Sequence, residues 1–283
     1  MSALAENIIE EIHEKTGLAS FSNRKKFNFN TEIESVICTE TSLINTLFLR
    51  RLGAKTFISP AAKFAFSSKK PDPGYGRLSI YEKFLALMSL VSKKPLSPNL
   101  SIPIPKQYLD FSAKQFKKNR CYVGLSPGAG SNEKKWPLEF FIKIAELLAS
   151  QNVTPTFFLG PMEEHLKLKL SRQIPSAIFP ESELEIGLAK SPLVTIALAR
   201  NLDFSLVNDS GGGHLIAAGG KKTITLFNGK RGAKFRSPFC EQIVLNAAAY
   251  NETKVKSIPY QPVLETVQNA LSDLQNNPLR RRV

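Results

Sequence analysis

Apolar positions in the second half of the chain alternate between short continuous runs and longer segments with helical spacing. The runs predict strands and the spaced segments predict helices. The strands are expected at 121–126, 154–159, 204–207 and 223–227, and the helices at 138–150, 162–173, 192–201 and 213–219. Strands that alternate with helices form a parallel sheet covered on both faces, so this half is expected to be an α/β domain.

The first half shows the same alternation over a shorter length. Apolar positions at helical spacing predict a helix at 3–15, and residues 34–59 read as strand, helix and strand. A loop at 67–77 and a helix at 80–91 follow. Four prolines between residues 93 and 105 then exclude a continuous helix or central strand. We therefore expect two domains, a smaller one over 1–110 and a larger one over 111–283.

Composition places the chain among soluble globular proteins. Its 283 residues are 42% hydrophobic and 22% charged, and no apolar run approaches the roughly 20 residues that span a bilayer. The acidic start lacks the basic residues and apolar core of a secretory signal, which favours a cytoplasmic protein. Cys38, Cys121 and Cys240 form no CxxC pair, so they are expected as core thiols. With three histidines and no HExxH spacing, no metal site is expected.

The formal net charge of +14 favours a polyanionic partner. Nucleic acid, anionic lipid head groups and phosphorylated or carboxylated glycans all fit that charge. No zinc-finger spacing, aromatic RNA-binding motif or helix-turn-helix accompanies the basic residues, so we expect no nucleic-acid partner.

The stretch 207–218 contains the densest candidate chemistry. A strand end leads into Gly211, Gly212 and Gly213, and a helix of small residues follows. Asp209 and Ser210 stand where a helix N-cap would, and His214 lies one turn further on. The pattern predicts a backbone cradle for phosphate, although a tight turn with no ligand gives the same pattern.

Two other loops follow predicted strands and carry suitable residues. The first, 126–137, offers Gly128 for close backbone approach and Lys134 or Lys135 as a countercharge for phosphate, and the second, 160–164, ends in two glutamates. Because ligands of open parallel sheets bind at the carboxyl ends of the strands, the three loops predict one nucleotide site. Each loop also has a structural interpretation, since Trp136-Pro137 is a common helix start and glutamates favour helix N-termini.

These motifs resemble those of family 9 glycosyltransferases, the bacterial lipopolysaccharide heptosyltransferases. The similarity covers about residues 118–275 and rests on Ser-Pro-Gly-Ala-Gly at 126–130, Lys134-Lys135-Trp136-Pro137, Phe158-Leu159-Gly160-Pro161, Asn208-Asp209-Ser210-Gly211 with His214-Leu215, and the strand 223–227. The resemblance implies a GT-B-like α/β fold, with two Rossmann-like domains built on parallel sheets. The N-terminal, acceptor-side domain is expected to be reduced.

The resemblance also implies roles for single residues. Lys134 would neutralise the donor diphosphate, and Glu164, or alternatively Glu163, would hold the ribose. The remaining binding residues would surround the pyrophosphate, namely Gly128, Asp209, Ser210, Gly211, Gly212 and His214. The implied reaction needs no cofactor. The donor would be a nucleoside-diphosphate sugar, with ADP-heptose as a candidate, and the acceptor lipopolysaccharide core or another acidic surface glycan, reached by peripheral contact with the inner membrane.

The first half resembles the family at 34–39, 49–55 and 80–87. The family's opening strand and its "LGD" loop, whose aspartate is the expected general base, are not found in residues 1–33. Either the chain begins late relative to the family or its acceptor domain is rebuilt. Glu40 is the nearest substitute base, but it also reads as the start of the next helix, so no catalytic residue is assigned.

Two other functions fit the same sequence. The chain could be a catalytically inactive, nucleotide-binding relative that acts as a partner or regulator. It could also be a different enzyme of the same architecture, such as a sugar-nucleotide epimerase or hydrolase.

Overall fold

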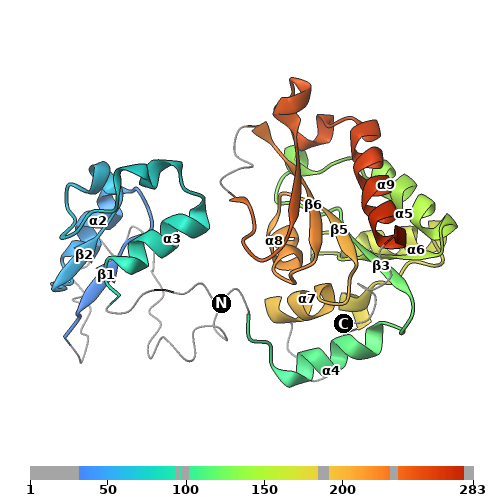
Figure 1. Ribbon diagram of the computed structural model, residues 1–283, viewed down its shortest axis with the longest axis horizontal. Coiled ribbons are helices and arrows are strands. Elements are labelled where there is room, and N and C mark those ends of the chain that lie inside the picture. The colour runs from blue at the N-terminus through green and yellow to red at the C-terminus, as the bar shows by residue number, and fades with distance from the viewer. Residues whose placement is uncertain (1–31, 93–95, 97–101, 184–190, 230–234, 277–283) are drawn as a thin grey trace. The chain divides into compact units, whose positions relative to one another are not determined.

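The computed structural model describes residues 32–92, 96, 102–183, 191–229 and 235–276. The chain divides into two compact units, residues 1–99 and 100–283 (Figure 1). The helix expected at 3–15 lies outside the described residues.

The first unit contains a small parallel sheet. Its elements are β1 (Ser35–Ile37), α2 (Leu43–Arg50), β2 (Thr56–Ile58), the 3-10 turns η2 (Ala61–Phe64) and η3 (Pro73–Arg77), and α3 (Ile80–Ser89). β1 and β2 pair in parallel, with Val36 opposite Phe57. Gly53, at a φ of +72°, lies in the turn between α2 and β2, a conformation that glycine adopts without steric cost. The expected strand, helix and strand are therefore confirmed.

The second unit is built on a five-stranded, entirely parallel sheet. Its strands are β3 (Cys121–Ser126), β4 (Val153–Phe157), β5 (Phe204–Asn208), β6 (Lys222–Phe227) and β7 (Gln242–Asn246). They lie in the order β4-β3-β5-β6-β7 (Figure 1). Because the strands are parallel, the loops after β3, β4 and β5 leave from the same edge of the sheet. The strand order reverses at β3, and open parallel sheets bind ligands at such a reversal.

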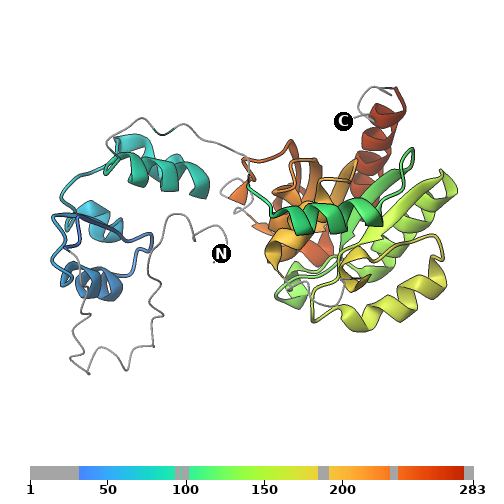
Figure 2. The ribbon, with the colours of Figure 1, turned by 90° about the horizontal axis from the view of Figure 1, so that it is seen from below.

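Helices cover both faces of this sheet, as the alternating sequence predicts (Figures 1 and 2). The helices are α4 (Lys106–Gln115), α5 (Leu138–Ser150), α6 (Lys167–Gln173), α7 (Pro192–Ala199), α8 (Gly211–Ala217) and α9 (Tyr260–Asn276), with short 3-10 turns η4 (Asn132–Lys134), η5 (Glu164–Leu166), η6 (Pro180–Glu183), η8 (Ala247–Tyr250) and η9 (Val255–Ser257). Two hydrophobic cores pack against the sheet, and side chains of β3 contribute to both of them. Val123 and Leu125 pack with α5, α6 and α9, whereas Tyr122 packs with α4, α7 and α8.

Three elements of the second unit were not predicted from the pattern, namely α4, β7 and α9. Tyr108 and Phe111 of α4 are buried in the core shared with α7. The boundary expected at residue 110 thus falls inside α4, whereas the compact units divide at 99/100.

The helix after β5 differs from its prediction. It begins at Gly211, not at Gly213, because the Ser210 side chain accepts a hydrogen bond from the Gly213 N–H at 3.0 Å and so caps a helix that starts two residues earlier. All three glycines are therefore helical, and no separate glycine-rich turn precedes the helix.

The cysteines are thiols with different degrees of burial. Cys38 is buried, whereas Cys121 and Cys240 are half-buried, so only the first fits the expected core position. Within the described residues, no helix has both the length and the apolar character needed to cross a bilayer.

Candidate functional site

The candidate site lies at the carboxyl edge of the five-stranded sheet. Lys134 and Lys135 follow β3, Glu163 and Glu164 follow β4, and Asp209 comes directly after β5. Since β4, β3 and β5 are neighbours in the sheet, side chains that are far apart in sequence meet here.

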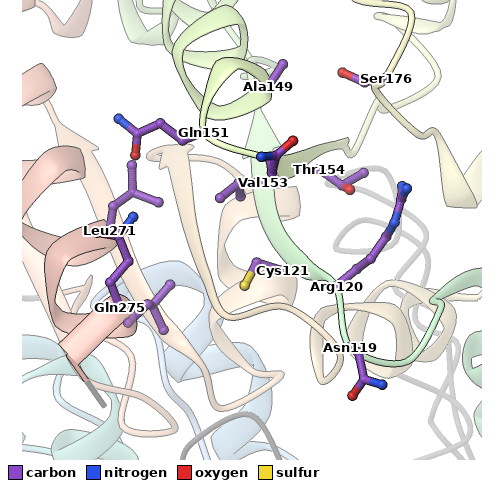
Figure 3. Close-up of a pocket in the computed structure, with 12 residues that line it drawn as sticks. Asn119, Arg120, Cys121, Ala149, Gln151, Val153, Thr154, Ser176, Leu271 and Gln275 are labelled. Atoms are coloured by element: carbon purple, nitrogen blue, oxygen red, sulfur yellow. The ribbon is translucent and has the colours of Figure 1, made fainter. Parts of the chain in front are cut away.

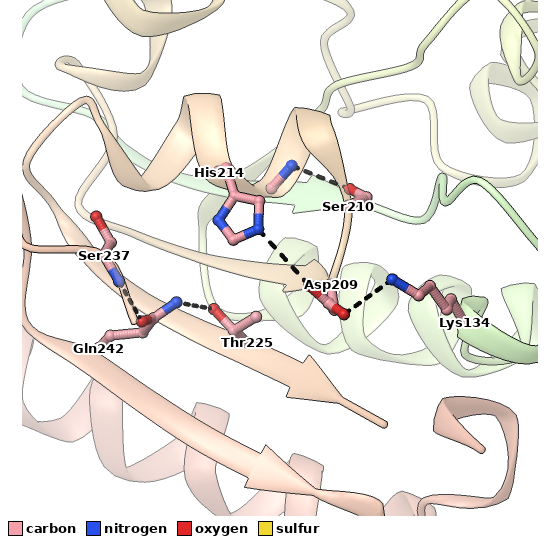
Figure 4. A network of polar contacts seen from close by, with 8 residues as sticks. Lys134, Asp209, Ser210, His214, Thr225, Ser237 and Gln242 are labelled. Carbon is pink, nitrogen blue, oxygen red and sulfur yellow. Dashed lines mark hydrogen bonds and ion pairs between the residues drawn. The ribbon is translucent and has the colours of Figure 1, made fainter. Parts of the chain in front are cut away.

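Asp209 links two of the residues expected in the site. Its side chain is only 8% exposed; Lys134 Nζ donates to its Oδ2 at 3.1 Å, and His214 Nε2 lies 3.6 Å from its Oδ1 (Figure 4). Burial acts to raise the pKa of Asp209, but the hydrogen bonds from His214 and Lys134, and the charges of both groups, outweigh it and lower the pKa below its ordinary value. The ionised carboxylate therefore holds an ammonium and an imidazole beside the first turn of α8.

The glycines of that turn differ in the space around them. A Cβ at Gly211 would meet nothing within 4 Å, and one at Gly212 would make ordinary contact with Ser126 Oγ at 3.6 Å. A Cβ at Gly213 would lie 2.5 Å from the Asn208 carbonyl oxygen, which no side chain can tolerate. Gly213 is therefore required for packing, whereas Gly211 and Gly212 leave the backbone open to a ligand.

A second ion pair lies beside the first. Lys135 Nζ donates to Glu163 Oε1 at 2.8 Å, and the Glu163 side chain is 9% exposed. Its other carboxylate oxygen would lie 2.8 Å from a Cβ at Gly128. The space next to Gly128 that the absence of a Cβ leaves open is therefore occupied by the Glu163 carboxylate. Through its ion pair with Lys135, Glu163 also links the loop after β4 to the loop after β3.

Asn208, the last residue of β5, fixes the position of the lysine-bearing loop. Its fully buried side chain donates to the Pro127 carbonyl oxygen at 2.8 Å and accepts from the Trp136 backbone N–H at 3.2 Å. The Trp136 indole is buried and donates to the Ile258 carbonyl oxygen at 2.9 Å. The loop is thus held at both ends, which places Lys134 and Lys135 with little freedom.

A cavity of about 410 Å³ opens between the loop after β4, the start of α7 and the first turn of α8. Phe158, Pro192 and Leu215 contribute apolar walls. Among the described residues, the charged side chains that line it are those of Glu164 and Glu181. The size and the mixture of apolar walls with few polar groups are typical of a small-molecule pocket.

Charges of opposite sign therefore occupy different parts of the site. Lys134 and Lys135 lie outside the cavity lining, whereas Glu164 and Glu181 belong to it. Carboxylates repel a phosphate and accept hydrogen bonds from hydroxyl and N–H groups. The arrangement can hold an anion near the lysines and a neutral group rich in hydrogen-bond donors in the cavity.

The structure brings all of the expected binding residues to this edge. Glu164 and Gly212 line the cavity, and the other expected residues lie at or beside the ion pairs, namely Gly128, Lys134, Asp209, Ser210, Gly211 and His214. Sequence reasoning missed Glu181 and Thr195, which line the cavity from η6 and α7. Neither residue carries a motif. Glu181 lies near β4 because Ile178, just before η6, pairs with Thr156 of β4, and Thr195 lies beside Glu181 from α7.

Glu40, considered as a substitute base, belongs to the first unit. It precedes α2, is exposed, and accepts a hydrogen bond from the Asn45 side-chain amide. This contact fits a residue that begins a helix.

A second hollow, of about 510 Å³, lies at the amino ends of β3 and β4 (Figure 3). Arg120, Gln151 and Gln275 contribute polar groups to it. The carboxyl end of α5 at Ser150 lies next to it, and the partial negative charge there disfavours an anion. Amino ends of strands are also not where open parallel sheets bind substrates, so we assign no ligand to it.

Two α/β units with parallel sheets, and a polar site at the carboxyl edge of the larger one, define a GT-B-like protein. The chain belongs to glycosyltransferase family 9 (heptosyltransferase), which it matches over residues 30–262. No curated protein matches it.

Solved structures share the fold at low sequence identity. A family 9 glycosyl transferase from Veillonella parvula has a TM-score of 0.66 and 16% identity, covering 86% of this chain and 75% of its own. The E. coli heptosyltransferase WaaC, solved with ADP, has a TM-score of 0.60 and 14% identity, covering 85% and 73%. The E. coli ADP-heptose lps heptosyltransferase II has a TM-score of 0.58 and 15% identity, covering 85% and 76%. These likenesses establish the fold.

Proposed function

We propose that the protein transfers a sugar from a nucleoside-diphosphate sugar to lipopolysaccharide core or another surface glycan. One observation carries the proposal: two fixed lysines lie beside a cavity lined by two carboxylates, at the edge where a parallel sheet binds ligands. The solved relatives, one with ADP and one named for ADP-heptose, support this donor class and make heptose a candidate sugar.

The proposed reaction breaks the bond between the anomeric carbon and the diphosphate oxygen. The acceptor hydroxyl oxygen forms the new bond and loses its proton, and the nucleoside diphosphate leaves with an additional negative charge. Lys134, Lys135 and His214 would stabilise that charge. An ammonium has three N–H donors, so Lys134 can bind a phosphate oxygen while it remains bonded to Asp209.

The proposal extends to the acceptor and its location. A net charge of +14 supports an acidic, phosphorylated glycolipid as acceptor. The same charge supports peripheral contact with an anionic membrane surface. We propose the cytoplasmic face of a bacterial inner membrane as the place of transfer.

A second candidate function is a nucleotide-binding relative without transferase activity, acting as a partner or regulator. The contact between Glu40 and Asn45 favours it, because the nearest substitute base is already engaged at the start of α2. General-base assistance is worth about 10²- to 10⁴-fold in rate, so a chain without it could bind donor and turn over very slowly.

One experiment separates these functions. The purified protein is titrated with ADP, UDP and GDP by calorimetry, and the preferred nucleotide is then supplied as its sugar with a lipid-glycan extract. Binding with sugar incorporation supports the transferase. Binding without incorporation over a panel of extracts supports the inactive relative, and no binding of any nucleotide overturns both.

A further inference from the structure

We propose that the first unit contacts an anionic lipid bilayer through the exposed sides of α2 and α3 (Figure 1). Among the described residues, ten large apolar side chains are exposed, and six of them belong to these two helices. These six, which we call the apolar set, are between 38% and 53% exposed, namely Leu43, Ile44, Leu47, Ile80, Phe84 and Met88. Exposed apolar residues that gather in one part of a protein mark an interaction surface.

In α2 the usual distribution of polar and apolar residues is reversed. Its buried residue is Thr46, whose hydroxyl donates to the Ser42 carbonyl oxygen at 2.8 Å and is hydrogen-bonded to Ser59 Oγ at 2.6 Å. Ile44 and Leu47 lie one turn apart on the exposed side. A surface helix normally turns its polar residues to water and its apolar residues to the core. The exposed side of α2 therefore suits an apolar environment.

α3 has more apolar residues than it buries. Six of its ten residues are apolar, and Leu87 is the buried one. Ile80, Phe84 and Met88 follow one another at four-residue spacing on the exposed side. A helix that is apolar on its outer side as well is normally enclosed by protein or lipid. Ten residues rise about 15 Å, half of the ~30 Å hydrocarbon core, so α3 would lie along a bilayer surface and not cross it.

Charge favours a bilayer over a protein as the occupant of this surface. Between residues 32 and 92 the chain has eight basic and five acidic side chains. Arg51 lies one turn beyond Leu47, and Lys83 lies next to Phe84, so both can reach from an apolar boundary to anionic head groups. A second copy of the chain carries the same net charge of +14, which opposes association of two copies.

The choice of a lipid occupant rests on the proposed function, because a glycolipid acceptor would bring the protein to a bilayer. What is added to that function is the surface that makes the contact. Attraction by charge alone would hold the protein above the head groups, whereas the apolar set would enter the boundary of the acyl chains. The two kinds of contact respond differently to salt, since salt screens only the first.

The first test measures co-sedimentation of the purified protein with vesicles of phosphatidylethanolamine and phosphatidylglycerol. The double variant Leu47→Gln, Phe84→Gln is expected to lower the partition coefficient roughly 10- to 100-fold, because two apolar side chains lose their transfer out of water. Part of the binding of the unaltered protein should persist in about 1 M salt, where the screening length is ~3 Å. The matched control is Leu168→Gln on α6 of the second unit, an exposed position that should stay within about twofold.

The second test locates the contact with single tryptophans. The natural tryptophan, Trp136, is 1% exposed in the second unit, so its emission gives a constant background. Leu47→Trp and Phe84→Trp each add a reporter at an exposed position. On addition of vesicles, we expect both emissions to shift to the blue and to be quenched by lipids brominated in their acyl chains. Leu168→Trp is the control and should not be quenched.

Several results would overturn the proposal. Binding that disappears in about 1 M salt, or that the double variant keeps in full, would mean contact by charge alone. Reporters that brominated lipids do not quench would place both helices outside the bilayer. Reporters that are already blue-shifted before vesicles are added would mean that protein covers the two helices.

Titration with nucleoside diphosphates in the absence of vesicles tests the proposed function separately. Normal nucleotide binding without vesicle binding overturns the lipid surface and leaves the proposed function in place. Vesicle binding with quenched reporters, but without binding of any nucleotide, overturns the proposed function and leaves the lipid surface.

Discussion

Lys134 Nζ lies 3.1 Å from Asp209 Oδ2, although the two residues are 75 positions apart in the chain. The neighbouring Lys135 is paired with Glu163 in the same way. Each ammonium is thus held in place by a carboxylate that is less than 10% exposed. Such pairing reduces the side-chain entropy that a lysine loses when it binds a ligand, so the cations are positioned before a phosphate arrives.

Replacing Lys134 should weaken binding of the diphosphate specifically. Hydrogen bonds to charged groups contribute about 1.5–3 kcal/mol, so Lys134→Met is expected to lower affinity for the preferred nucleoside diphosphate about 10- to 100-fold. The corresponding nucleoside, which has no phosphate, should bind as before. Calorimetry with both ligands tests this, with the exposed Lys143→Met as control. Equal losses for nucleoside and diphosphate would contradict the assignment.

Asp209 should contribute to stability in a pH-dependent way. Its pKa in the folded protein is below the ordinary value of 3.8, so its stabilising effect is present above 3.8 and is lost as the pH falls through the folded pKa. Asp209→Asn cannot titrate. The difference in unfolding free energy between the unaltered protein and this variant should therefore shrink as the pH falls from neutral to below 3.8. Urea denaturation over that range measures it, and a constant difference would contradict the lowered pKa.

Alanine substitutions at two of the three glycines in α8 should have different effects, one on stability and the other on nucleotide binding. Gly213→Ala forces a Cβ against the Asn208 carbonyl oxygen and is expected to cost about 1–3 kcal/mol of stability. Gly211→Ala has open space around the new methyl group, so thermal unfolding should not be lowered. It should instead weaken nucleotide binding, because the methyl group occupies the open side of the backbone. A Gly211→Ala variant that binds normally would place the phosphate elsewhere.

Substitution of the buried Asn208 should lower the free energy of unfolding more than substitution of most other polar residues. Asn208→Ala leaves the Pro127 carbonyl and the Trp136 N–H without this partner, at about 1–3 kcal/mol for each group. Asn246→Ala, which removes an exposed cap of η8, is the control and should cost less. Chemical denaturation of both variants gives the comparison, and equal losses would show that the link between β5 and the lysine loop is weak.

The fold was predictable where apolar periodicity and strand alternation were strong. β3 to β6 and the helices between them follow from that pattern. The start of α4 directly follows a run of prolines, and β7 has only three apolar residues, Ile243 to Leu245, between polar ends, so neither gave a clear signal. α9 carries buried Val263, Val267, Ala270 and Leu271 at helical spacing, a signal that was present and could have been used.

The site was predictable as a set of loops but not as a set of contacts. Strand order explains why the loops after β3, β4 and β5 meet. The ion pairs depend on side chains 28 and 75 positions apart, and no local pattern encodes such a distance. Glu181 follows a segment that reaches β4 through a single bridge, so its place in the cavity required the three-dimensional structure.

The pair of Lys135 and Glu163 should behave as a coupled unit. Removing one member leaves a charge without its partner, most severely at Glu163, which is 9% exposed and lies against Gly128. Lys135 is one-third exposed, and solvent reduces the effect on its side, so we expect a coupling free energy of about 1 kcal/mol. A double-mutant cycle with Lys135→Met and Glu163→Gln, followed by denaturation, measures it. The exposed pair of Lys254 and Glu133 is the control cycle and should show a smaller coupling. If the two cycles agree, the pair is no more than a surface contact, and the loop after β4 is held by its backbone alone.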